Sequence, residues 1–157
     1  MMLNYEKLYI KTIKNGTIID HIPYKVGINL IFICNINISS IRSIICLNLF
    51  SKKNKIKDIL KLDNYFLNKE QINKIKVYAT NSTINTIYNY KIVKKKIATL
   101  PKYVVDIIDC PNKNCITRNE PISSKFLITN YISKKIWNCQ YCEKQFDHKF
   151  IVSKKLK

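Results

Sequence analysis

Cys110-Pro-Asn-Lys-Asn-Cys115 and Cys139-Gln-Tyr-Cys142 decide how the last third of this 157-residue chain folds. Each pair of cysteines places two thiols on one tight turn. Two such turns facing each other supply the four soft ligands of a tetrahedral Zn²⁺ site. We therefore predict one zinc ion bound by Cys110, Cys115, Cys139 and Cys142. Four thiolates leave no coordination position open, so we expect a structural rather than a catalytic metal.

The segment around these cysteines is expected to be a domain of its own. Leu100-Pro101 marks a boundary, because proline disfavours helix in the residue before it. This divides the chain into residues 1–100 and 101–157. A domain as short as the second one rarely builds a sufficient core alone, and zinc then contributes folding energy.

We do not expect Cys34, Cys46 or His148 to bind the metal. His148 follows Cys142 closely enough to be an alternative ligand, but four thiols already complete the shell, so we interpret it as a surface histidine beside Asp147. Cys34 and Cys46 lie in apolar segments and are expected to be small core residues.

Upstream of Pro101, hydrophobic periodicity alternates between strand and helix patterns. Asn15-Gly16 is expected to be a turn, Pro23 to begin a helix, and Asn68 with Gln71 to form a capping box at the start of a second helix. The predicted strands are Tyr5 to Ile13, Ile41 to Phe50, Ile59 to Phe66, and a last one through Ile87, Tyr90 and Ile92. The order β-α-β-β-α-β is that of an α+β, ferredoxin-like fold, in which two helices cover one face of an antiparallel sheet.

Composition excludes several classes of protein. The chain has two glycines, too few for a Walker loop or a dinucleotide fingerprint. Its formal charge is +18, but arginine occurs only as Arg42 and Arg118. A nucleic-acid binder would carry more arginine, because the planar guanidinium group pairs bidentately with phosphate and guanine. We therefore do not expect nucleic acid as a partner. The start lacks a signal-peptide pattern and no apolar stretch reaches membrane-spanning length, so we expect a cytoplasmic protein without membrane contact.

Several motifs, taken together, resemble the regulatory chain of aspartate carbamoyltransferase from about Lys7 to Ile151. The motifs are Gly16-Thr-Ile-Ile-Asp-His-Ile-Pro23, Leu47-Asn48-Leu49, Cys110 to Ile116, Glu120-Pro-Ile-Ser-Ser124 and Cys139 to Lys144. The resemblance implies an N-terminal allosteric nucleotide-binding domain and a small, mostly β, C-terminal zinc domain. It also implies regulatory-chain dimers that link catalytic trimers into a dodecamer of six catalytic and six regulatory chains, with CTP, ATP and UTP as effectors.

The resemblance also assigns residues to the nucleotide pocket. It places Asp20 on the ribose, His21 near the phosphates, and Lys61 and Lys95 on the triphosphate. The other implied contacts are a sugar contact at Asn85, a base-binding wall of Ile13, Ile87, Tyr90 and Ile92, and an N-terminal contribution from Lys7. Lys11 and Tyr88 stand where the family commonly has acidic residues, and basic residues usual near Thr129 and Tyr131 are replaced.

The resemblance thus implies a non-catalytic regulatory subunit, acting in pyrimidine biosynthesis, that binds nucleoside triphosphates and docks on catalytic chains. The resemblance implies that Asn112, Asn114, Tyr141 and Glu143, which accompany the zinc-binding turns, contact those chains. Two alternatives stay open from the residues alone. The chain could be a structural scaffold with an eroded effector pocket, or a zinc-ribbon protein that binds nucleic acid.

Overall fold

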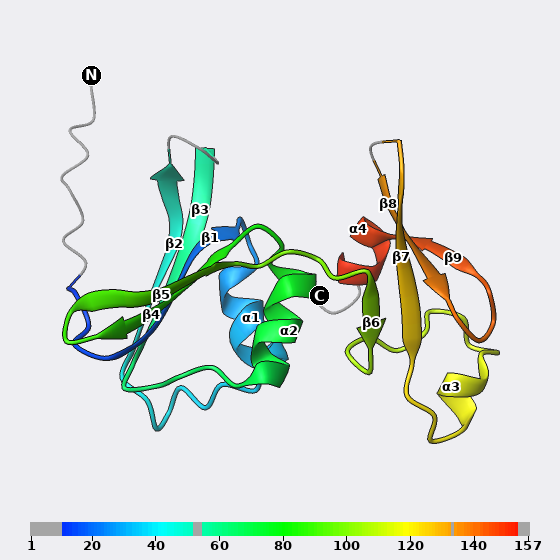
Figure 1. Cartoon of the computed structure of the whole chain (residues 1–157), viewed down its shortest axis with the longest axis horizontal. Helices are drawn as coiled ribbons and strands as arrows, with labels where there is room; N and C mark the ends of the chain where they lie inside the picture. Colours follow the sequence, from blue (N-terminus) through cyan, green and yellow to red (C-terminus); the bar gives the residue numbers. More distant parts are fainter. Residues whose placement is uncertain (1–10, 52–54, 133, 154–157) are drawn as a thin grey trace.

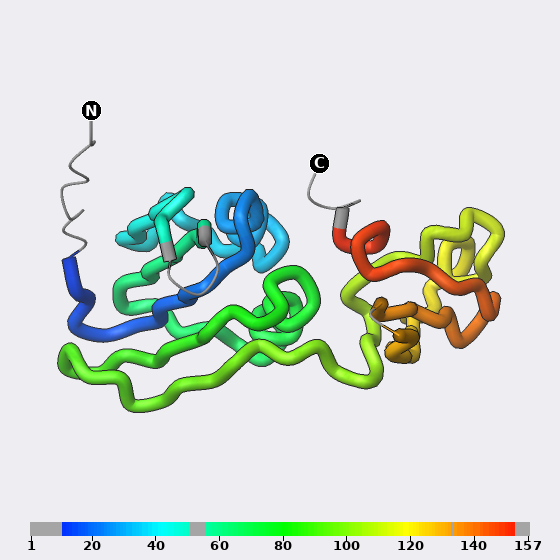
Figure 2. The backbone as a smooth tube through the Cα atoms, turned by 90° about the horizontal axis from the view of Figure 1, so that it is seen from above, coloured from blue at the N-terminus to red at the C-terminus, as the bar shows by residue number. Residues whose placement is uncertain are grey.

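The computed structural model describes residues 11–51, 55–132 and 134–153. The chain forms two lobes, each built on its own antiparallel sheet, and the segment after β5 (Lys91–Ile97) leads from one lobe to the other (Figures 1 and 2). No helix in the described part of the chain is both long and apolar enough to cross a membrane.

The first lobe is an α+β unit. Its elements, within the described residues, are β1 (Gly16–Pro23), α1 (Gly27–Ile33), β2 (Ser43–Ser51), β3 (Lys55–Asp63), α2 (Lys69–Tyr78), β4 (Thr83–Tyr88) and β5. The strand order is β2-β3-β1-β4-β5, and every neighbouring pair is antiparallel. This is the predicted ferredoxin-like arrangement with β5 added at one edge.

Both helices cover the same face of this sheet (Figure 1). Ile19 on β1 pairs with Leu60 on β3 and with Ile84 on β4, and these side chains are buried with Leu30 of α1 and Ile75 of α2. The predicted capping box is present: Asn68 Oδ1 accepts from the Gln71 amide at 2.8 Å, and Gln71 Oε1 accepts from the Asn68 amide at 3.0 Å. Successive strand side chains point to opposite faces, so the alternate residues of these strands lie on the face that the helices do not cover, where the site described below is found.

The prediction of the first strand was wrong in its position. Residues 11–13 are not in a strand, residues 1–10 lie outside the described part, and β1 begins at Gly16. Gly16 has φ of 126°, and a Cβ there would lie 2.1 Å from the Leu62 carbonyl oxygen. Gly16 therefore opens a strand packed closely against β3, and only glycine fits this approach.

The last predicted strand is in fact a hairpin, and the strand before it is shifted. β4 and β5 are joined by Asn89 and Tyr90, whose φ values are 46° and 64°. Two successive residues with positive φ make a tight turn that matches strand twist, but tyrosine is a rare choice for it, so the sequence gives no turn signal. β3 ends at Asp63, so the prediction of strand to Phe66 was also wrong.

The second lobe is mostly β, as predicted. Its elements among the described residues are β6 (Tyr103–Val105), α3 (Ile116–Asn119), β7 (Lys125–Tyr131), β8 (Lys134–Cys139), β9 (Gln145–Asp147) and α4 (His148–Ser153). The strands follow the order β6-β7-β8-β9. Its small core centres on Phe126 and Trp137, both fully buried, whose rings meet edge to face at 5.6 Å.

The two cysteines of the first lobe follow the prediction only in part. Cys34 is buried, and burial raises the pKa of its thiol to about 12, as expected for an inert core residue. Cys46, on β2, is only partly buried.

Candidate functional site

The second lobe brings its four cysteines together at one point. Cys110 and Cys115 flank the loop before α3, and Cys139 and Cys142 flank the turn after β8. Their Sγ atoms all lie within 4.8 Å of one another, with Cys110 to Cys142 at 3.7 Å and Cys115 to Cys139 at 3.8 Å. A tetrahedron with Zn–S bonds of about 2.3 Å has S···S edges of about 3.8 Å. The observed spacing therefore fits one tetrahedral zinc ion.

Backbone hydrogen bonds hold the sulfur atoms in this arrangement. The Cys115 amide donates to the Asn112 carbonyl at 3.1 Å, which closes the first turn. The Cys139 amide donates to the Lys144 carbonyl, and the Glu143 amide donates to the Cys139 carbonyl, both at 3.0 Å. Glu143 has φ of 57°, which the tight second turn requires. The ligands are thus positioned by main chain on two short loops.

The thiols differ in how readily they lose a proton. Burial raises the pKa of Cys110 and of Cys139. Burial also disfavours the thiolate of Cys142, but hydrogen bonds from Asn112, from the Lys144 backbone and from neighbouring thiols outweigh it and lower the pKa to about 7. Thiolate is the form that binds metal, so metal binding must displace protons from the buried thiols.

His148 is not part of this cluster. Its Nδ1 accepts a hydrogen bond from Trp137 Nε1 at 3.1 Å, and its ring stacks on the indole with centroids 5.8 Å apart. The interpretation of His148 as a surface residue was therefore incomplete, because the side chain packs against the core of the lobe. Burial and nearby Lys135 lower its pKa, and Asp147 only partly offsets them.

The face of the first sheet that the helices leave uncovered carries several of the predicted nucleotide-binding residues. Ile18 on β1 pairs with Lys61 on β3 and with Asn85 on β4, and Asn85 pairs with Lys95 on β5. Residues in one row across an antiparallel sheet point to the same side, and adjacent strands are about 4.8 Å apart. Lys61, Asn85 and Lys95 therefore follow one line across the sheet, which we call the effector face.

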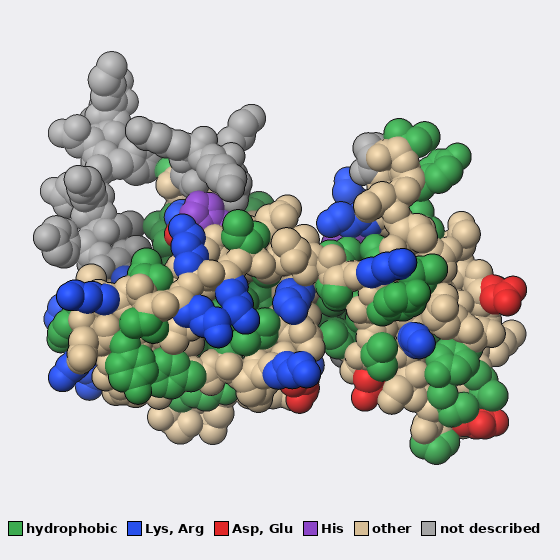
Figure 3. All heavy atoms as spheres, in the orientation of Figure 1, with side chains coloured by type: hydrophobic (Ala, Val, Ile, Leu, Met, Phe, Trp, Pro, Cys, Tyr) green, Lys and Arg blue, Asp and Glu red, His purple; other side chains and the backbone are tan. Residues whose placement is uncertain are grey.

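A pocket of about 490 Å³ opens at one end of the effector face. Ile13, Lys61 and Tyr90 of the predicted set line it, together with Lys11 and Arg42. Lys61 is nearly buried, and its Nζ donates to the Lys11 carbonyl at 2.7 Å. Burial lowers the pKa of Lys61, so the site holds a cation that has lost part of its hydration. Figure 3 shows Lys and Arg side chains gathered on the first lobe, with a histidine among them.

Asp20 and His21 form a separate cluster further along β1. The strand pairing shifts between Ile19 and Ile22, and His21 has φ of 57°. Such a bulge directs an extra side chain to the same region, and His21 Nδ1 lies 3.3 Å from Asp20 Oδ2. Lys57 on β3 completes the cluster, with its Nζ 2.7 Å from Asp20 Oδ1. Neither Asp20 nor His21 lines the pocket.

The other predicted residues vary in exposure. Asn85 is nearly buried, and its Oδ1 has no hydrogen-bond partner among the described residues. Ile87 is buried, whereas Ile92 and Lys95 are exposed on β5. Lys7 lies outside the described residues.

Sequence reasoning missed three cations near these residues: Lys57 beside Asp20, and Lys14 and Arg42 in the pocket lining. Lys57 and Arg42 belong to strand and loop segments with no motif, and only the strand register brings them near Asp20 and the pocket. The one signal that could have identified Lys57 was the expectation that a partly buried carboxylate such as Asp20 pairs with a nearby cation.

Comparisons with known proteins match both lobes. The family model described as the aspartate carbamoyltransferase regulatory chain, allosteric domain, matches residues 8–99, and that family's metal binding domain matches residues 102–152. The chain belongs to the aspartate carbamoyltransferase regulatory chain family. Aspartate carbamoyltransferase regulatory chains that it resembles include that of Vibrio vulnificus strain YJ016, 43% identical over 94% of this chain and 97% of the relative.

Two further relatives carry the same description. The regulatory chain of Yersinia pestis strain Pestoides F is 41% identical over 94% of this chain and 96% of its own length. That of Yersinia enterocolitica is 40% identical over 93% and 95%, respectively. As a regulatory chain of aspartate carbamoyltransferase, an enzyme of pyrimidine synthesis, this is a non-catalytic subunit with an allosteric and a metal-binding domain. The clustered cysteines lie in the metal-binding domain.

Proposed function

We propose that the effector face of the allosteric domain binds a nucleoside triphosphate, with CTP, ATP and UTP as the effectors. The observation that carries the proposal is the row of Lys61, Asn85 and Lys95 across one sheet face beside a pocket that Lys61 lines. In this proposal Lys61 and Lys95 hold phosphates, and the unpartnered Asn85 Oδ1 accepts a hydrogen bond from a sugar hydroxyl.

The electrostatics of Lys61 support a phosphate ligand. The Lys61 ammonium is nearly buried, so a phosphate charge beside it would interact with it more strongly than with a lysine in open water. At an effective dielectric of 20, one phosphate charge at about 4 Å contributes about 4 kcal/mol before desolvation. The negative phosphate charge would favour the charged ammonium and so oppose the effect of burial, which lowers the pKa of Lys61. The base would rest near Ile13 and Tyr90, with Ile87 and Ile92 on the same side of the hairpin, and Lys7 would contribute from the N-terminal segment.

The cluster of Asp20 and His21 would serve the same ligand from the neighbouring part of the face. Asp20 would meet the ribose and His21 the phosphates, while Lys57 holds Asp20 in place through its 2.7 Å ion pair. This division of roles explains why the bulge at His21 matters: it brings two polar side chains to one place.

The metal-binding domain is proposed to dock on catalytic chains. Asn112, Asn114, Tyr141 and Glu143 lie on the loops that the four sulfur atoms hold together, so zinc would shape the docking surface without contacting the partner. We further propose regulatory-chain dimers that link catalytic trimers into a dodecamer of six catalytic and six regulatory chains, in the cytoplasm. Residues 1–100 and 101–157 would be the two functional units.

Titration calorimetry of the full, zinc-loaded chain with CTP and ATP tests the effector site. We expect saturable binding to the wild-type chain, and at least tenfold weaker binding to Lys61→Gln, a loss of about 1.4 kcal/mol. Lys125→Gln, an exposed change on β7 in the other domain, is the matched control and should bind as the wild type does. Equal affinities for wild type and Lys61→Gln would refute the assignment. If the chain shows no saturable nucleotide binding but still assembles with catalytic chains, it is a structural scaffold.

Regulation is tested separately on the assembled enzyme. Linkage requires that a substrate analogue on the catalytic chains change nucleotide affinity by the same factor with which nucleotide changes analogue affinity. Couplings of this kind are typically about 1–3 kcal/mol. Nucleotide affinity that is unaffected by the analogue would leave binding intact but remove the allosteric function.

A further inference from the structure

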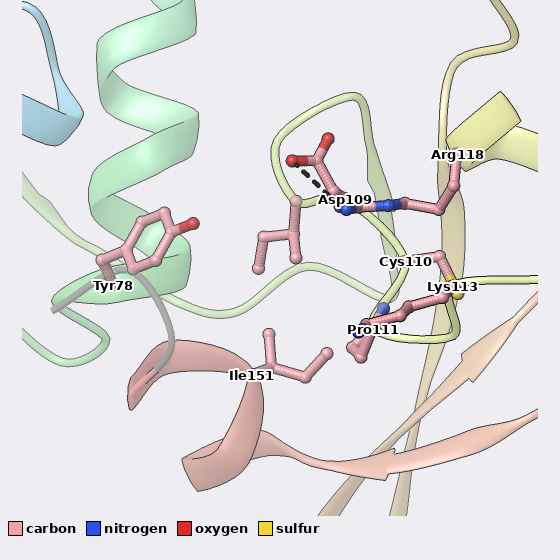
Figure 4. Close-up of a pocket in the computed structure, with 8 residues that line it drawn as sticks. Tyr78, Asp109, Cys110, Pro111, Lys113, Arg118 and Ile151 are labelled. Atoms are coloured by element: carbon pink, nitrogen blue, oxygen red, sulfur yellow. Dashed lines mark ion pairs between the residues drawn. The ribbon is translucent and has the colours of Figure 1, made fainter. Parts of the chain in front are cut away.

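A second pocket, of about 290 Å³, lies between the two domains and is separate from the effector face. One wall comes from Tyr78 at the end of α2. The others come from the loop that carries the first metal-binding cysteines, from α3 through Arg118, and from α4 (Figure 4). Because its walls belong to both domains, whatever fills it contacts both at once.

Tyr78 supplies an unused hydrogen bond to this pocket. The residue is 3% exposed, and its hydroxyl has no hydrogen-bond partner among the described residues. Figure 4 shows the hydroxyl directed toward the pocket. Most buried polar side-chain atoms in folded proteins are paired, so a phenol left unpaired inside a pocket points to a missing acceptor.

The charged side chains that line the pocket carry a positive surplus. Burial raises the pKa of the Tyr78 hydroxyl, and the Asp109 carboxylate is close enough to raise it further. Arg118 Nη1 lies 3.7 Å from Asp109 Oδ2, so one cation is matched to the carboxylate. Lys113 adds a further positive charge to the same wall. Two cations and one carboxylate favour an anionic group at this end of the pocket.

The middle of the pocket is apolar. Ile108 of the cysteine-bearing loop and Ile151 of α4 both line it and are themselves buried. A ligand that satisfies all three parts has an acceptor at one end, an anion at the other and a short hydrocarbon chain between them.

We propose that this interdomain pocket binds a small aliphatic dicarboxylate. One carboxylate accepts the Tyr78 hydroxyl, the methylene groups lie on Ile108 and Ile151, and the second carboxylate faces Lys113 and Arg118. None of the side chains proposed to contact the ligand belongs to the effector face or binds the metal. Cys110 also lines the pocket, but it is not one of the proposed ligand contacts. The ligand would tie the two domains together, and it would therefore favour one relative position of the domains over others.

Three probes separate the parts of the proposal: glutarate, butyrate and 1,5-pentanediol. They are titrated into the full zinc-loaded chain and followed by NMR chemical shifts of Ile108, Ile151 and Tyr78. Glutarate should bind at least about tenfold more tightly than butyrate, and the diol should bind weakest because it carries no charge. Zinc content is measured after each titration to exclude metal removal. A failure of glutarate to shift these three residues, or equal binding of glutarate and the diol, would overturn the proposal.

Variants then assign the two ends of the ligand. Tyr78→Phe should weaken glutarate about tenfold while leaving the ring in place, and Lys113→Gln should weaken both glutarate and butyrate. Lys125→Gln is again the distant control and should change neither. Lys113→Gln alters an exposed side chain, so it keeps the test decisive if Tyr78→Phe does not fold. Glutarate affinity unchanged in Lys113→Gln would mean that binding occurs elsewhere, and the site would be abandoned.

Discussion

Asp58 is a fully buried carboxylate that holds three segments of the allosteric domain together. It lies on β3, and its Oδ2 accepts from the Gly27 amide at 3.1 Å, at the start of α1. Its Oδ1 accepts from the Asn48 amide at 3.0 Å, where β2 bulges. The charge faces the positive end of a helix and two amide donors, so its burial is compensated.

Asp58→Asn should destabilise the chain by about 2–3 kcal/mol, because one amide donor would then face an NH₂ group. The free energy of unfolding from urea denaturation, at fixed zinc concentration, measures the loss. Glu120→Gln, an exposed carboxylate in the metal-binding domain, is the control and should change stability by less than about 0.5 kcal/mol. A loss of similar size in both variants would show that Asp58 has no special role.

At this scale the sequence predicted residue types better than it predicted their surroundings. The four cysteines were identifiable from spacing alone, because metal coordination fixes both the residue and the interval. The resemblance singled out Asp20 and Lys61, but their partners, Lys57 and the Lys11 carbonyl, depend on strand register, which no local pattern encodes.

Among the elements, α4 and β8 meet at a pair that responds to pH. His148 at the start of α4 accepts the Trp137 Nε1 hydrogen bond through Nδ1, which requires that nitrogen to be unprotonated. Burial and Lys135 lower the pKa of His148, so protons bind more strongly in the unfolded chain than in the folded one. Stability is therefore complete above the ordinary histidine pKa of about 6.5 and falls as pH drops below it.

His148→Gln should remove this part of the acid dependence, because glutamine is neutral throughout and its side-chain oxygen can accept the same hydrogen bond. Thermal unfolding of wild type and variant at saturating zinc, between about pH 7.5 and 5.5, compares them on either side of that pKa. Both proteins share the same cysteines, so the difference between their pH profiles isolates the imidazole. Parallel profiles would contradict the assignment.

The elements that periodicity misplaced are those whose ends depend on unusual backbone. β1 starts at Gly16 because of a close approach to Leu62, and the alternation of the preceding residues suggested an earlier strand. The β4–β5 hairpin turns at Asn89 and Tyr90 without the usual glycine. The start of α2 was predictable because the capping box at Asn68 marks it. The prediction that Pro23 begins the first helix was wrong, because Pro23 ends β1 and α1 begins at Gly27 after Val26, which makes no side-chain cap.

For the whole molecule, the four sulfur atoms are the main link between distant parts of the metal-binding domain. The two cysteine pairs come from loops at opposite ends of the β7–β8 hairpin in sequence, and they close a domain whose core is little more than Phe126, Trp137 and their neighbours. Zinc in comparable small domains contributes on the order of 10–16 kcal/mol.

Cys142→Ala should therefore reduce zinc content from one ion per chain and prevent stable association with co-expressed catalytic chains. Native mass spectrometry with metal analysis reads both quantities from one sample, and a thiol-reactive metal stripper applied to wild type should have the same effect. Cys46→Ala is the matched control, since this cysteine lies in the allosteric domain and outside the cluster. A complex that survives quantitative zinc loss would refute the proposed role of the metal in docking.

Trp137 is the chain's single tryptophan, and it lies at the centre of the metal-binding domain with Phe126 on one side and His148 stacked on another. Indole emission therefore reports on one domain alone, without any added label. Tryptophan fluorescence can therefore follow the folding of that domain, its loss of metal and its binding to a partner. The allosteric domain carries no tryptophan and does not contribute to this signal.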